Sequence, residues 1–205
     1  MRRLLLGAAA AAVLTGCSAG VPAEEDAGGP ATAPAPATAP ETTEAEAAPG
    51  AELPVTRFDG LSNEHVEGTV AYPEVPPVGG PHNARWLACD VYDEPVPPET
   101  AVHSLEHGGV WITHRPDLPA DEVEQLAALR ALDEEYVLVS PFDGLPAPVV
   151  VTAWGVQLQA GSAADPGIEA FVREYAGGDQ GGEPGAPCRT GGLTLDEARE
   201  AVGAG

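Results

Sequence analysis

The histidines are the residues of this chain best suited to chemistry. All five lie between positions 65 and 114 of a 205-residue sequence. Imidazole is the commonest metal ligand in proteins and the usual acid–base group near neutral pH. Their clustering therefore predicts a site that uses imidazole, either to hold a metal ion or to move protons. The five are His65, His82, His103, His107 and His114.

The tightest spacing is the stretch HSLEH at residues 103–107, which fits the H-x-x-E-H pattern of inverse zincin peptidases. On a helix, His103 and His107 would lie one turn apart on one face, with Glu106 beside them as a general base for hydrolysis. On an extended segment, the two histidines would share a face and Glu106 would point away from them. Pro97-Pro98 and Gly108-Gly109 bracket the stretch, and both conformations stay open.

The elements that must position these residues follow from hydrophobic periodicity. Strands are predicted at 109–114 and 136–140 and within the β-prone run 148–159. One helix is predicted over 119–134. A second begins at Asp165-Pro166, an N-cap followed by proline, and carries an apolar stripe at Ile168, Phe171, Val172 and Tyr175. The fold class predicted is α+β, a small mixed sheet with two helices on one face, preceded by a long Pro-rich ordered loop region over 63–100.

The first residues predict where the protein is found. Residues 1–16 combine two arginines with a short apolar run, as a signal peptide does. Leu14-Thr15-Gly16-Cys17 resembles the lipobox of bacterial lipoproteins. That resemblance implies cleavage before Cys17 and lipidation of its thiol. We therefore expect a protein anchored in the lipid bilayer through Cys17, on the outer face of the bacterial cytoplasmic membrane.

Composition divides the rest of the chain. Residues 17–56 are rich in Ala, Pro, Glu and Thr and predict a disordered tether, because they offer too little apolar surface to fold. Residues 57–192 form the predicted globular domain, and 193–205 a short tail in which Thr194 and Glu197 fit a capping box. The chain has 9 basic against 32 acidic residues, which argues against nucleic acid as a partner. No protein partner can be named from the sequence.

Several motifs resemble those of a bacterial extracytoplasmic domain of unknown function, family 3105. The specific pieces are PPVGGPH at residues 76–82 and HSLEHGG at 103–109, within a similarity that spans about residues 63–188. The resemblance implies a shared fold and a shared site, and it brings no established activity. The site it implies consists of His65, His82, His103 and His107.

Ligand chemistry then indicates which metal such a site would hold. Imidazole with carboxylates, and no methionine besides Met1, suits Zn²⁺ or Cu²⁺ rather than Cu⁺. Nearby carboxylates would add ligands or orient the rings: Glu67, Asp90, Asp93 and Glu106. The function we expect is metal binding or handling at the cell surface, without turnover. Two alternatives stay open, namely a metal-dependent hydrolase that uses Glu106 and a non-catalytic envelope interaction module whose histidines are structural.

Two cysteines remain besides Cys17. In an oxidising location Cys89 and Cys188 would most simply pair, and the bond would hold the C-terminal loop beside the histidine-rich region. Alternatively, Cys89 would serve as a thiolate ligand close to His82. The sequence leaves both readings open.

Overall fold

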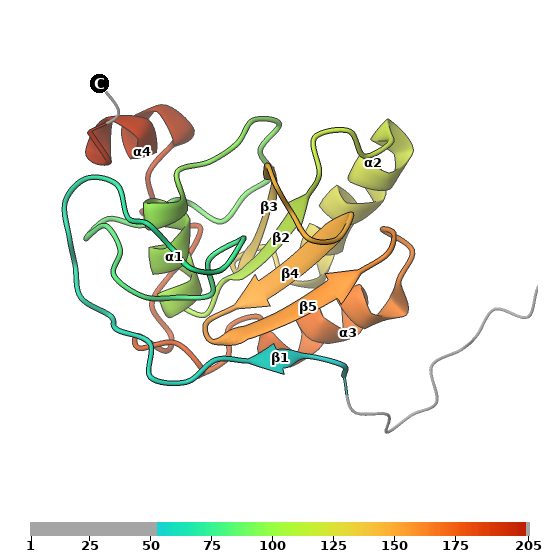
Figure 1. Ribbon diagram of the computed structural model, residues 1–205, viewed down its shortest axis with the longest axis horizontal. Coiled ribbons are helices and arrows are strands. Elements are labelled where there is room, and N and C mark those ends of the chain that lie inside the picture. The colour runs from blue at the N-terminus through green and yellow to red at the C-terminus, as the bar shows by residue number, and fades with distance from the viewer. Residues whose placement is uncertain (1–52, 204–205) are drawn as a thin grey trace, which may run out of the picture. The chain divides into compact units, whose positions relative to one another are not determined.

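A computed structural model describes residues 53–203 (Figure 1). The predicted signal peptide, Cys17 and nearly all of the predicted tether lie outside these residues. The strands are β1 Thr56–Arg57, β2 Val110–His114, β3 Val137–Pro141, β4 Val149–Ala153 and β5 Val156–Ala160. The helices are α1 Pro98–Glu106, α2 Ala120–Ala128 with the short 3₁₀ segment Leu129–Leu132, α3 Pro166–Tyr175 and α4 Leu195–Ala201.

The strands form one mixed sheet in the order β1-β5-β4-β2-β3. Strands β2 and β3 are parallel and are joined through α2, whereas the other neighbours pair antiparallel. Strand β2, which lies between β4 and β3, is buried along its whole length. Its alternating side chains enter two cores, with Val110 and Ile112 on one face and Trp111 on the other. This confirms the α+β fold class.

The β-prone run at 148–159 forms two strands instead of one. It turns at Trp154-Gly155, where Gly155 has a φ of 69°, and the two halves pair as an antiparallel hairpin. A positive φ costs glycine little, so Gly155 is the residue that lets the chain reverse.

One face of the sheet is covered by α2 and α3 (Figure 1), as predicted. The predicted stripe of α3 is buried, from Ile168 to Tyr175. The carboxylate of Asp165 accepts a hydrogen bond from the Gly167 N–H, which confirms it as the N-cap.

The other face is covered by α1, by the irregular segment before it and by the C-terminal residues. In this second core Leu87 and Leu105 pack with Trp111 from the sheet. Residues 58–97 contain only isolated β-bridges and no longer strand or helix. Within residues 53–203, no helix is both long enough and apolar enough to span a bilayer.

The C-terminal residues belong to this core. We expected 193–205 to form a tail outside the globular domain, whereas Leu193, Ala198 and Val202 are buried. Helix α4 starts with the capping box between Thr194 and Glu197, as its sequence predicts.

Candidate metal centre

The stretch at 103–107 is helical, because α1 runs from Pro98 to Glu106 and His107 caps its C-terminus. Proline at the first helical position needs no N–H partner, and Glu99 in the first turn suits the positive end of the helix dipole. His103, Glu106 and His107 therefore lie near the negative end of α1, which favours a cation. All three are buried, with exposed fractions of 2–3%.

The loop before α1 is tied along the helix by hydrogen bonds. The Asn83 N–H donates to the Glu99 carbonyl, and the Ser104 hydroxyl donates to the Leu87 carbonyl at 2.6 Å. These bonds hold residues 82–87 against α1 and bring His82 to the helix.

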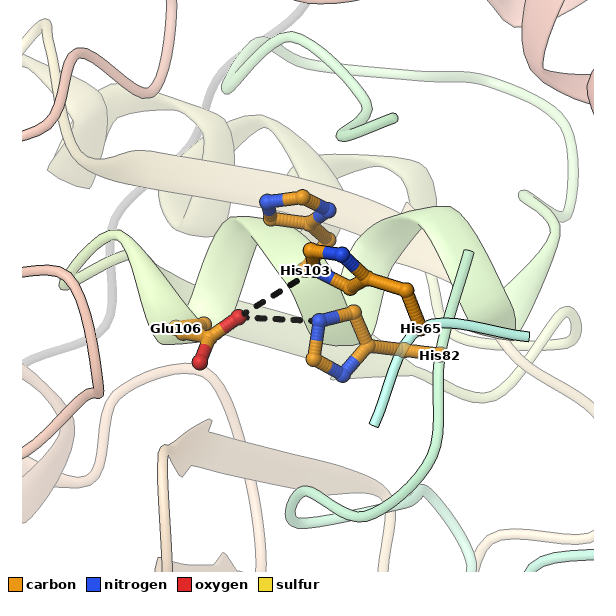
Figure 2. A group of neighbouring side chains, drawn as sticks. All are labelled: His65, His82, His103 and Glu106. Carbon is orange, nitrogen blue, oxygen red and sulfur yellow. Dashed lines mark ion pairs between the residues drawn. The ribbon is translucent and has the colours of Figure 1, made fainter. Parts of the chain in front are cut away.

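His65 reaches the same place through backbone pairing with His82. The His82 N–H donates to the Glu64 carbonyl, and the Val66 N–H donates to the His82 carbonyl, which forms an isolated bridge. The imidazole rings of His65, His82 and His103 have centroids 4.9–5.0 Å apart. Figure 2 shows these rings gathered against the Glu106 carboxylate.

Hydrogen bonds fix the chemical state of the buried rings. The Nδ1 atoms of His82, His103 and His107 lie 2.7–2.8 Å from the carbonyl oxygens of Gly80, Asn83 and Pro187. A carbonyl oxygen only accepts, so each Nδ1 carries the proton and donates. In a neutral ring this leaves Nε2 with a free lone pair, which is how a metal-binding histidine is oriented.

The His82 Nε2 lies 2.9 Å from the Glu106 Oε2, and both side chains are almost completely buried (Figure 2). Neither atom has a hydrogen-bond partner with good geometry. With the His82 proton on Nδ1, two acceptor atoms face each other, and only a second proton or a metal ion between them relieves the repulsion.

Burial makes the second proton unfavourable. It lowers the pKa of His82, although the Gly80 carbonyl and Glu106 act in the opposite direction. The pKa of His103 is lowered to about 4, chiefly by burial and also by the neighbouring histidines, although the Asn83 carbonyl acts in the opposite direction. The neutral rings are thus ready to accept a cation.

One ligand atom from each of His65, His82, His103 and Glu106 lies within 4.8 Å of the others. This group offers three imidazole nitrogens and one carboxylate oxygen, a donor set that suits Zn²⁺ or Cu²⁺. We call these four residues the inner group. His65 is its exposed member, with 44% of its side chain accessible.

A second group shares a member with the first. It consists of His103, His107 and Glu183, again with ligand atoms within 4.8 Å of one another. The His107 Nε2 lies 3.2 Å from a carboxylate oxygen of Glu183, whose side chain is 51% exposed. We call this the outer group.

The histidines expected at one site thus divide between two overlapping groups. His65, His82 and His103 come together with Glu106, while His107 joins His103 and Glu183. The other carboxylates considered from the sequence lie elsewhere. Glu67 lines a cleft with Arg85, Asp93 lines a groove with His114, and Asp90 pairs with Arg130.

Cys89 and Cys188 are joined by a disulfide in the second core. The bond closes a loop with a sequence separation of 99 and brings the C-terminal segment beside α1. Trp86 strengthens this link by donating its indole N–H to the Cys188 carbonyl.

Sequence reasoning did not find Glu183. Its segment passes tightly over α1, and a Cβ at Gly181 or Gly182 would overlap atoms of Glu106. The only signal in the sequence was Cys188, since pairing with Cys89 would bring the nearby carboxylates to the histidines.

Fold and site together define a small α+β domain with a buried histidine–carboxylate group that could hold a metal ion. A family model described as a protein of unknown function (DUF3105) matches residues 65–190, and the chain belongs to this family. The match contains every residue of both groups. No curated protein and no solved structure matches the chain.

Proposed function

We propose that this protein binds one divalent metal ion, Zn²⁺ or Cu²⁺, in the inner group and handles it at the outer face of the bacterial cytoplasmic membrane. The single observation that carries the proposal is the contact between the His82 Nε2 and the Glu106 Oε2. These buried atoms lie 2.9 Å apart without a hydrogen-bond partner. A cation bound by both would replace a repulsion between lone pairs with two coordinate bonds.

The placement of Glu106 favours binding over hydrolysis. A hydrolase built on H-x-x-E-H would hold its metal with both histidines of the motif and keep Glu106 free as a base. Here Glu106 lies with His103 in the inner group, while His107 belongs to the outer one. Glu106 would therefore act as a ligand, which fits a binding protein better than a peptidase.

The membrane location of this proposal rests on different observations. The lipobox at Leu14-Thr15-Gly16-Cys17 supports a lipid anchor on Cys17. The Cys89–Cys188 disulfide supports an oxidising compartment, since such bonds persist outside the cytoplasm. The acidic composition supports a protein that approaches neither nucleic acid nor anionic lipid through its charge.

The test is the metal content of the full chain, exported by a bacterial host and purified in detergent without a His tag. We expect about one Zn or Cu per chain after dialysis, by analogy with sites that hold their ion through four protein ligands. Glu106→Gln and His82→Gln should both lose it. Mass spectrometry of the elements measures the stoichiometry, and circular dichroism checks that the variants fold.

His114→Gln is the matched control, because His114 is also buried and also has its Nδ1 against a carbonyl, but lies outside both groups. It should keep the metal. If the wild-type chain stays metal-free after exposure to excess Zn²⁺ and Cu²⁺, the proposal fails. The histidines would then be structural, as in the interaction-module alternative.

A further inference from the structure

We propose that His103, His107 and Glu183 form an exchange position through which the ion enters and leaves the inner group, with His103 as a ligand in both places. This inference rests on the proposed function and concerns the route of the ion rather than its resting place. It assigns roles to His107 and Glu183, which the inner group does not use.

The argument starts from the single free lone pair of His103. Its Nδ1 donates to the Asn83 carbonyl at 2.7 Å, so Nε2 is the only ring atom left to bind a metal. Because His103 belongs to both groups and its Nδ1 is engaged, both would use this same Nε2 atom. A neutral imidazole nitrogen binds one ion at a time, so the two positions are alternatives.

The two positions also differ in the number of their ligands and in the burial of their carboxylate ligand. The inner group offers four protein ligands, which fills a tetrahedral zinc site. The outer group offers three, so an ion there keeps a coordination position open for a ligand from solution or from a partner. The carboxylate of the outer group, Glu183, is half exposed, whereas that of the inner group, Glu106, is buried and the exposed ligand there is His65.

The ring of His107 is also oriented to bind an ion in the outer group. Its Nδ1 donates to the Pro187 carbonyl at 2.8 Å, and its Nε2 faces Glu183. The rings of His103 and His107 have centroids 4.7 Å apart, so an ion can pass from one to the other over a short distance. Throughout the passage it keeps His103 as a ligand, and the step requires no oxidant or reductant.

The test is the rate at which the full chain loads with Zn²⁺ and gives it up to excess chelator, followed by stopped flow. Trp86 packs against His103 and His107 and provides the fluorescence signal. In Glu183→Gln we expect loading and release both to slow by about tenfold, the lower end of what lost metal-site partners cost. The dissociation constant should change by less than about threefold, because a site that the ion occupies only transiently changes the loading rate and the release rate by the same factor.

Glu124→Gln is the control, because it removes the same charge from an exposed residue of α2, which packs on the opposite face of the sheet from α1. It should leave both rates unchanged. His107→Gln should behave like Glu183→Gln, and neither should alter a stoichiometry of one ion per chain.

Three results would overturn the exchange position. They are two ions bound at once, a weaker dissociation constant with an unchanged loading rate, or rates equal to those of wild type. Each leaves a protein that still binds metal, so it differs from failure of the proposed function, in which wild type binds none.

Discussion

Replacing Glu106 with glutamine should make the metal-free protein more stable, although it changes a buried residue at the centre of the site. In the wild type the carboxylate oxygen faces the unprotonated Nε2 of His82 at 2.9 Å. A glutamine of the same shape can place its amide N–H there and donate to that nitrogen. The substitution turns a contact between two acceptors into a hydrogen bond.

The size of the effect follows from what an unpaired buried group costs. Leaving such a group unsatisfied costs about 1–3 kcal/mol, so the variant should gain an amount in that range. For a domain of about 150 residues, each kcal/mol raises the melting temperature by roughly 2–4 °C.

With metal bound, the wild type should become more stable than Glu106→Gln. Free metal at a hundred times the dissociation constant stabilises the wild type by about 2.7 kcal/mol, while the variant has lost a ligand and should gain much less.

The assay is thermal or denaturant unfolding of both proteins, first after chelator treatment and then with excess Zn²⁺. Glu99→Gln is the matched control, because Glu99 is also buried on α1 but its carboxylate already accepts from the Val70 N–H at 2.8 Å. Its response to metal should equal that of the wild type. The reasoning is refuted if metal-free Glu106→Gln loses about 3–5 kcal/mol, since that is the cost of breaking a true buried ion pair. His82 would then be protonated.

Three further predictions concern the framework around the site. Gly181→Ala should lower the free energy of unfolding by about 1–3 kcal/mol, because its Cβ would overlap the backbone oxygen of Glu106. Gly161→Ala has open space around its Cβ and should leave the free energy of unfolding unchanged. Equal free energies of unfolding for the two variants would contradict this contact. Cys188→Ala should cost about 2–5 kcal/mol in denaturant unfolding through loss of the disulfide, and an unchanged midpoint and slope would count against it. Hydrogen bonds at the helix N-cap lower the pKa of Glu197. The stabilisation that this carboxylate gives α4 should therefore be present above the ordinary carboxyl pKa and be lost as pH falls through the lower pKa of the folded state. A titration of the carboxyl group by NMR whose midpoint is at or above that of an unfolded peptide would refute this.

The sequence by itself determined the elements whose signals are local. The stripe from Ile168 to Tyr175, the N-cap Asp165 and the alternation through β2 each depend on residues within a few positions, and the structure has them as predicted. The resemblance carried by the glycine- and histidine-rich motifs likewise gave the family. Local periodicity is enough for such features, because it reflects which side of an element is buried.

Only the tertiary structure decided the conformation of residues 103–107 and which residues make up each candidate metal-binding group. In the sequence, Pro97-Pro98 and Gly108-Gly109 left both a helical and an extended conformation open, whereas in the structure Pro98 is the first residue of the helix. The helix is settled by the loop of residues 82–87, which bonds along it, and by burial against Trp111. These contacts join residues far apart in the chain.

The same reason explains why Glu183 was not found in the sequence and why the histidine that faces Glu106 could not be predicted. Glu106 meets His82 because the backbone of His82 is held against α1, and Glu183 meets His107 because the disulfide-linked segment crosses the end of that helix. Sequence spacing shows which residues are able to bind a metal. Which of them face one another depends on long-range packing, and that packing divides the histidines into two groups that share His103.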